Sequence, residues 1–140
     1  LGGMTLSHAR TGIVHQMARP LGAQCRVPHG LANAILLPRV VQALGGRLPA
    51  RLAALYPYLT ALDGQPLGAD VGEADRAERA KELILSFFAQ LPIPTTLTEA
   101  GVQNVPVESL TQDALQGKEA VVNPCLVNPA EVSRIYSDCI

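Results

Sequence analysis

Three histidines lie near the start of this 140-residue chain, and they are its residues best suited to bind a metal. His8 and His15 are seven positions apart, which places them on nearly the same face of a helix, with Arg19 one further turn along. His29 lies in the first turn of a second predicted helix, where the positive end of the helix dipole disfavours an imidazolium. Neutral imidazole is the form that binds a metal. The spacing allows His15 and His29 to share one ion if the link between the helices folds them together.

Spacing alone also allows a second interpretation of these histidines, because a buried imidazole is often a hydrogen-bonded core residue. Two ligands by themselves hold a transition metal weakly. His8 shares the stripe of His15, and we interpret it as a hydrogen-bonding residue near the site and leave it out of the predicted ligand set.

The elements that must position these residues are predicted to be helices. Apolar residues recur at helical intervals along most of the chain, and strand patterns are scarce. Glycines and prolines mark the expected breaks: Gly22 ends the first helix, Pro38 kinks or ends the second, and Pro57 interrupts the third. The expected helices are residues 3–21, 28 or 29 to 38, 48–62, 73–91, 107–115 and 129–138, with a single turn at 96–100 closed by Gly101. We therefore expect an all-α helical bundle.

Composition restricts the class of protein. An apolar content of 48% and a net charge of -1 suit one soluble globular domain. Balanced charge and 4% aromatic residues leave no basic surface for nucleic acid. The uncharged stretch that most resembles a membrane span, residues 27–38, is shorter than the roughly 20 apolar residues that span a bilayer, so no membrane segment is expected.

The termini and cysteines give further expectations. The three cysteines are an odd number without C-x-x-C spacing, so we expect reduced and mostly inert thiols. The chain opens without a basic segment or cleavage motif, which favours a cytoplasmic protein. It also begins without Met and inside an apparent helix, so we expect a fragment or a processed product.

Two longer motifs surround the histidines and make the pattern more specific. Residues 12–23 read GIVHQMARPLGA, and residues 27–38 read VPHGLANAILLP. Together they resemble the signature of the iron-containing (group III) alcohol dehydrogenases, which include lactaldehyde reductases, propanediol dehydrogenases and butanol dehydrogenases. The resemblance continues through residues 94–97, 101–102, 113–115, 123–124 and 135–136, so that it spans essentially the whole chain.

The resemblance implies a fold and a metal. The expected fold is a helical bundle like the C-terminal domain of the dehydroquinate synthase-like, iron-type alcohol dehydrogenase fold. In that family one Asp and three His hold the ion, and the last two histidines match His15 and His29. Iron(II) is the expected metal, with zinc as the alternative.

Other family features are missing from this sequence. The remaining two ligands of the family form an Asp-x-x-x-His pair, and no such pair occurs in this chain. The Gly-rich phosphate loop that follows a strand is missing too, so no nucleotide-binding residue is predicted. Residues 1–140 are therefore expected to be a single helical domain, a C-terminal fragment lacking the N-terminal nucleotide-binding domain.

Arg19 departs from the commonest family pattern, in which a His follows the first of these ligand histidines by four residues. The resemblance implies a place near substrate or nicotinamide for this residue, and we assign it as a catalytic residue. An arginine can bind a carboxylate or phosphate in a bidentate manner, but it cannot shuttle a proton as His can. His8 stands where the family more often has Asn. Gly12 and Gly30 allow close approach of a cofactor ring or a neighbouring backbone, or serve helix packing.

The function that the resemblance implies is a metal-dependent alcohol dehydrogenase. The intact enzyme would interconvert a small alcohol and its aldehyde or ketone with NAD or NADP, and the isolated chain is expected to be inactive. The alternative is a non-catalytic helical module that forms a homo-oligomer or binds a partner. We expect either a homo-oligomer or association with an N-terminal α/β domain.

Overall fold

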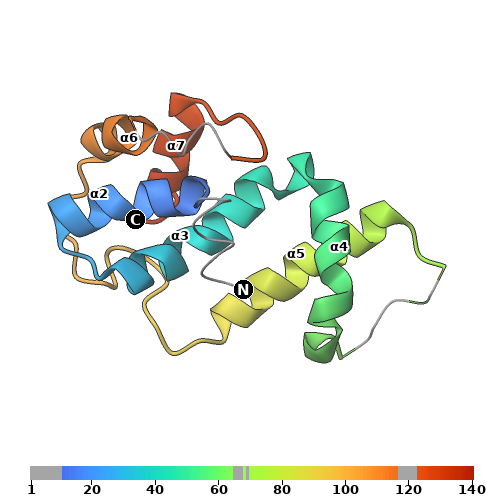
Figure 1. Cartoon of the computed structure of the whole chain (residues 1–140). Coiled ribbons are helices and arrows are strands. Elements are labelled where there is room, and N and C mark those ends of the chain that lie inside the picture. The colour runs from blue at the N-terminus through green and yellow to red at the C-terminus, as the bar shows by residue number, and fades with distance from the viewer. Residues whose placement is uncertain (1–10, 65–67, 69, 117–122) are drawn as a thin grey trace. The chain divides into compact units, whose positions relative to one another are not determined.

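The computed structural model describes residues 11–64, 68, 70–116 and 123–140, and this part of the chain is helical without strands. The predicted all-α fold is confirmed. Figure 1 shows the order of the elements, which are α2 (Ile13–Cys25), α3 (His29–Leu44), η1 (Gly45–Arg47), α4 (Pro49–Leu59), η2 (Thr60–Leu62), α5 (Glu73–Ala89), α6 (Val107–Leu115) and α7 (Pro129–Ser137). His8 and the expected start of the first helix lie outside the described residues.

Three helices continue through an internal proline, and two of these prolines, Pro38 and Pro57, were expected to disturb their helices. Pro20 lies inside α2, Pro38 inside α3 and Pro57 inside α4. A proline removes one helical N–H donor, yet the helix persists where packing against the rest of the protein outweighs that loss. Pro38 was expected to kink or end its helix: the expected end is wrong, and the kink stays a prediction. The predicted interruption at Pro57 is wrong.

The end of α2 was also predicted too early. The helix continues through Gly22 to Cys25, and its cap is Arg26, which has a left-handed backbone with φ 56°. Glycine is favoured at such caps because it tolerates positive φ, but here the chain takes that conformation four residues later at an arginine. The start of α3 at His29, and the helices at 73–89, 107–115 and 129–137, agree with the expectations.

The predicted turn after residue 95 is present. Ala100 N–H donates to the Thr96 carbonyl at 3.1 Å, and Val102 N–H donates to the Leu97 carbonyl at 2.9 Å. Gly101 closes the turn with φ 88°, a conformation that favours glycine.

Contacts divide the described chain into two compact units. The first unit joins the residues up to Arg39 with those from Ile93 to Ile140, and the second is Val40–Pro92. The expectation of one domain stays a prediction. In the first unit α2 packs against α6, and α6 packs against α7.

The core of the first unit is formed mainly by apolar side chains. Its fully buried side chains include Met17, Leu21, Ile35, Leu36, Leu97, Leu110, Val132 and Ile135. Tyr136 is also buried, and its hydroxyl donates a hydrogen bond to the Met17 carbonyl at 2.8 Å. Leu97 N–H donates to the Cys139 carbonyl at 2.7 Å. Hydrogen bonds therefore connect the C-terminal residues to the middle of α2 and to the turn after residue 95.

The three cysteines are free thiols, in agreement with their odd number and spacing. Burial raises the pKa of the Cys139 thiol to about 12, and it also raises the pKa of Cys25. Because the thiolate is the reactive form, both side chains are poor nucleophiles at neutral pH.

Replacing Tyr136 with Phe tests the bond to Met17. The ring stays, the hydroxyl is lost, and the free energy of unfolding should fall by about 1 kcal/mol. Urea denaturation at pH 7 measures the change. Equal stability of the variant and the original protein would show that this hydrogen bond contributes nothing.

The same variant changes the response to alkali. Burial raises the pKa of both Tyr136 and Cys139, so the folded chain holds their protons at a pH where the unfolded chain has released them. The protein should therefore lose stability as the pH rises from about 9 to about 12. Tyr136→Phe should lose less over that range, as measured by denaturation at a series of pH values.

The second unit is built on the crossing of α4 and α5 (Figure 1). Tyr56, Ala80 and Leu83 form its buried cluster, and Leu52 and Leu59 pack against it.

A buried carboxylate ties the end of η2 to α5. The Tyr56 hydroxyl and the Arg79 Nε donate to Asp63 Oδ2 at 3.1 and 3.0 Å, and a second Arg79 nitrogen donates to Oδ1. Hydrogen bonds to Asp63 and Glu82 raise the pKa of Arg79 above its usual value. The fork of Arg79 thus satisfies both oxygens of Asp63.

Removing this carboxylate with Asp63→Ala should destabilise the unit by about 2 kcal/mol, because the Tyr56 hydroxyl and Arg79 lose their acceptor. Glu82→Gln is the matched control, since Glu82 is exposed and its pair with Arg79 should contribute less than about 1 kcal/mol. Chemical denaturation of both variants makes the comparison. A smaller loss for Asp63→Ala than for Glu82→Gln would contradict the role of the buried carboxylate.

Every helix among the described residues is too short or too polar to cross a lipid bilayer.

Candidate metal centre and adjoining pocket

The start of α2 is held by a side chain that is distant in the sequence. Asn123 Oδ1 accepts a hydrogen bond from Ile13 N–H at 3.2 Å, and its Nδ2 donates to the Cys125 carbonyl at 2.7 Å. A Cβ on Gly12 would lie 3.3 Å from Asn123 Oδ1, whereas a Cβ on Gly30 would meet nothing within 4 Å among the described atoms. Gly12 therefore allows close approach of a side chain.

The other end of α2 turns the chain toward α3. Arg26 takes the left-handed conformation, and the backbone N–H groups of Arg26 and Val27 both donate to the Leu21 carbonyl. Val27 is buried, and Ala32 N–H donates to the Pro28 carbonyl at 2.9 Å as α3 begins. Three residues thus complete the reversal.

This reversal brings His15 of α2 beside His29 of α3. Their ring centroids lie 5.2 Å apart with an interplanar angle of 60°. His15 is half-buried and His29 is exposed. The predicted convergence of these two imidazoles is present, and their metal role stays a prediction.

The separation of the rings suits a common ion. A metal–nitrogen bond of about 2 Å puts the ion about 3 Å from each ring centroid, and two such rings at a tetrahedral angle have centroids about 5 Å apart. The pair supplies two neutral nitrogen donors of a kind that iron and zinc accept. The residues present therefore fit half of a coordination shell.

The other half is not supplied by the described part of the chain. No group of three or more His, Cys, Asp or Glu side chains gathers there in a way that can hold a metal. Asn33, one turn after His29, donates from Nδ2 to the His29 carbonyl at 2.9 Å. This bond supports the first turn of α3, where His29 lies.

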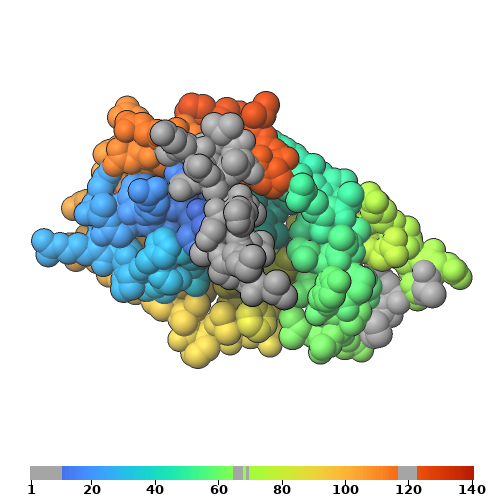
Figure 2. Space-filling view, viewed as in Figure 1, coloured from blue at the N-terminus to red at the C-terminus, as the bar shows by residue number. Residues whose placement is uncertain are grey.

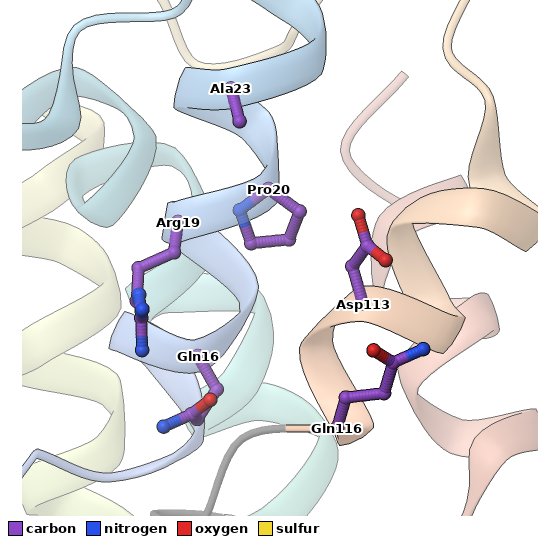
Figure 3. A pocket seen from close by; sticks show the side chains of 6 residues that line it. All are labelled: Gln16, Arg19, Pro20, Ala23, Asp113 and Gln116. Atoms are coloured by element: carbon purple, nitrogen blue, oxygen red, sulfur yellow. The ribbon is translucent and has the colours of Figure 1, made fainter.

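A polar pocket lies between α2 and α6, with a volume of about 370 Å³. Figure 3 shows Gln16 and Arg19 on α2, and Asp113 and Gln116 on α6, with Pro20 and Ala23 completing the lining. Gln16 is only 2% exposed, whereas Arg19 and Asp113 are exposed. Gln24 Nε2 donates to Asp113 Oδ2 at 2.5 Å.

The sequence singled out Arg19 but missed the other polar residues of this pocket. Gln16 follows His15 directly, and nothing in its local pattern distinguishes a buried glutamine from a surface one. Asp113 and Gln116 are distant in the sequence, and although the helix at 107–115 was predicted, neither residue was singled out. Packing of α6 on α2 brings them to Arg19.

Replacing Arg26 with Gly should stabilise the turn that positions the two histidines. A left-handed backbone costs a non-glycine residue roughly 1 kcal/mol, so Gly should raise the free energy of unfolding by about 0.5 to 1 kcal/mol. Arg26→Val should lower it, because a β-branched residue fits this conformation poorly. Denaturant titrations of both variants provide the measurement, and a change of the same sign in both would contradict the strain.

Comparison with known proteins relates this arrangement to a family. Residues 1–140 match the sequence profile of the "Fe-containing alcohol dehydrogenase family, C-terminal". Long-chain-alcohol dehydrogenase 1 of Geobacillus thermodenitrificans is 33% identical over 137 residues, and 1,3-propanediol dehydrogenase of Citrobacter freundii is 32% identical over 137 residues. These alignments cover 97% of this chain but only 33% and 34% of the relatives.

Solved structures agree with the sequence relatives. A 1,3-propanediol oxidoreductase superimposes with a TM-score of 0.82 and 30% identity, covering 99% of this chain and 35% of that one. An alcohol dehydrogenase from Oenococcus oeni gives a TM-score of 0.80 and 26% identity, with 99% and 35% coverage. The chain spans about a third of the length of these proteins. The helical fold, the paired motifs and the family match together show that this chain belongs to the C-terminal domain of the iron-containing alcohol dehydrogenase family.

Proposed function

We propose that this chain is the metal-carrying helical part of an NAD- or NADP-dependent alcohol dehydrogenase that interconverts a small alcohol and its aldehyde or ketone. The observation that carries the proposal is the approach of the His15 and His29 rings to 5.2 Å within a family of alcohol dehydrogenases. The proposal keeps the cytoplasmic setting that the sequence favours.

His15 and His29 would hold the metal, with iron(II) as the first candidate and zinc as the alternative. A divalent ion with open positions supplies Lewis-acid chemistry, which lowers the pKa of a bound alcohol and favours hydride departure to the nicotinamide. Raw affinity favours zinc over iron(II), so the family name does not by itself decide the metal.

The residues of this chain would position the two metal ligands and set the charge near them. Asn123 holds the start of α2, from which His15 projects, and the bond from Asn33 supports the first turn of α3, from which His29 projects. Arg19 adds a fixed positive charge one helical turn from His15, and it cannot act as the proton acceptor that a histidine provides. Proton removal in the complete enzyme therefore falls to another group or to solvent.

The chain is proposed to act together with an α/β segment that lies outside the given sequence. That segment would supply the Asp-x-x-x-His pair and the Gly-rich nucleotide loop. We expect the 140-residue chain alone to show no alcohol oxidation. A chain extended by such a segment should reduce NAD or NADP when a small alcohol is added.

Cobalt(II) titration of the purified chain tests the ligand pair, since the visible spectrum of this ion reports nitrogen coordination. The original protein should bind the ion, and His15→Ala and His29→Ala should each weaken binding at least about tenfold. His8→Ala is the matched control, because His8 is left out of the ligand set, and its affinity should match that of the original protein.

Equal affinity in all four proteins would remove the physical basis of the proposal. Binding lost in His8→Ala but kept in His29→Ala would assign the ion to a different group of residues. Circular dichroism of each variant checks that the helices are intact.

A second candidate is a non-catalytic helical module that forms homo-oligomers or binds a partner. It is favoured by apolar side chains on α4 and η2, where Leu55, Tyr58 and Leu62 are 47%, 83% and 51% exposed. Their spacing of three and four residues places them on one side of the helical segment. Light scattering of the original chain and of Leu55→Ser/Tyr58→Ser separates the candidates. The module would be favoured if the original chain forms an oligomer, the variant does not, and the chain shows no affinity for metal.

A further inference from the structure

Asn33 carries a buried side-chain oxygen that has no hydrogen-bond partner among the described residues. Its Nδ2 donates to the His29 carbonyl at 2.9 Å, one helical turn earlier. The amide must be oriented in this way, because the opposite orientation would face its oxygen toward the carbonyl oxygen. Oδ1 is therefore left without a donor. A buried acceptor in this state costs free energy, so its presence calls for a cause other than stability.

The two imidazoles of the candidate metal centre lack the complementary group. Within the described part of the chain, no ring nitrogen of His15 or His29 takes part in a hydrogen bond. An imidazole that binds a metal through one nitrogen keeps an N–H on the other. That N–H normally has an acceptor, which fixes the tautomer and the orientation of the ring. The centre thus needs an acceptor close to the ligand histidines.

His29 is the ring that Asn33 can reach. The two residues are four positions apart on α3, a spacing at which Cβ atoms lie about 5 to 6 Å from each other. Side chains on a helix lean toward its N-terminus, so Asn33 lies over the turn that carries His29. The ring of His29 is exposed, and the start of α3 lies at the surface in Figure 2. The ring can therefore rotate without displacing core residues.

We propose that Asn33 is a positioning residue of the metal centre: its Oδ1 accepts the Nδ1–H of His29 and leaves Nε2 to the ion. This inference rests on the proposed function. The bond from Nδ2 to the His29 carbonyl already holds the amide, so the acceptor needs little reorganisation when the ion binds. An amide oxygen suits this role because it is a neutral acceptor and adds no charge to the centre.

Two variants separate the acceptor of Asn33 from its donor. Asn33→Asp keeps an oxygen and loses Nδ2, whereas Asn33→Leu has a similar volume and loses both. In cobalt(II) titrations of the full chain, Asn33→Leu should bind at least about tenfold more weakly than the original protein. Asn33→Asp should bind at least as tightly as the original, because a carboxylate is the stronger acceptor. Equal weakening in both variants would assign the effect to Nδ2 and overturn the role of the oxygen.

Asn104→Leu is the matched control, since Asn104 is an exposed asparagine in the segment before α6. Its affinity for cobalt(II) should equal that of the original protein.

The stability of the metal-free chain distinguishes a positioning role from a structural one. Leucine removes the unpaired oxygen from the interior and favours a helix more than asparagine does. Asn33→Leu should therefore unfold at the same urea concentration as the original protein or at a higher one, although it binds metal more weakly. A variant that loses both stability and cobalt(II) affinity would assign Asn33 to the structure of α3 and overturn the proposal.

NMR of the zinc-loaded chain with isotopically labelled histidine detects the proposed bond directly. His29 should bind zinc through Nε2, and its signals are identified by their absence in His29→Ala. Its Nδ1–H should be protected from exchange with water in the original protein and in Asn33→Asp, but not in Asn33→Leu. Coordination through Nδ1, or equal protection in Asn33→Leu, would overturn the inference.

Failure of the proposed function gives a different result. An original chain that binds neither cobalt(II) nor zinc would overturn the proposed function, and this inference with it. Metal binding that depends on His15 and His29 but is equal in the original protein and in Asn33→Leu would overturn this inference alone.

Discussion

The arrangement of the candidate centre depends on the reversal of the chain between α2 and α3. Arg26 has a left-handed backbone conformation, in which its Cβ is crowded by the backbone, at a cost of roughly 1 kcal/mol. Two N–H groups that bond to the Leu21 carbonyl, and the burial of Val27, offset that cost. Pro28 then begins the next helix with its φ already restricted. The link is short, and His29 follows it directly in the first turn of α3.

The position of α2 is set by the end of the chain as much as by its own sequence. Asn123 satisfies the first turn of α2, and the Tyr136 hydroxyl reaches the Met17 carbonyl, two residues from His15. These contacts join residues more than a hundred positions apart in sequence, so they form only when the whole first unit has folded. A ligand that binds His15 and His29 only in the folded state would therefore stabilise that unit as a whole.

The sequence predicted most helices because their apolar spacing and their caps are local signals. Asn128 with Glu131 forms a capping box at α7, and the amphipathic face of α5 is regular. The errors lie at Gly22, Pro38 and Pro57, where local propensity favours a break. In each case the helix continues, because burial and neighbouring contacts decide the outcome and neither is visible in a short stretch of sequence.

The candidate site shows the same difference between local signals, which the sequence displays, and tertiary contacts, which it does not. The types and spacing of residues, with the motifs around them, pointed to His15, His29 and Arg19. Imidazole is a common metal ligand and a guanidinium carries a permanent charge, so both residue types can be recognised in the sequence. Gln16, Asp113 and Asn123 were not found, because amides and carboxylates are common on surfaces and gain a role here only through packing. His8 lies outside the described residues, so its interpretation stays a prediction.

A coordination shell that is half complete has a consequence for the proposed enzyme. Two imidazoles held at a fixed separation need little reorganisation to accept an ion, yet two donors alone bind it weakly. Ligands from another segment would add affinity only when that segment lies against this one, so the ion would stabilise the closed arrangement and bind tightly only within it. Substrate oxidation would then be restricted to the assembled protein, in which the nicotinamide is also present.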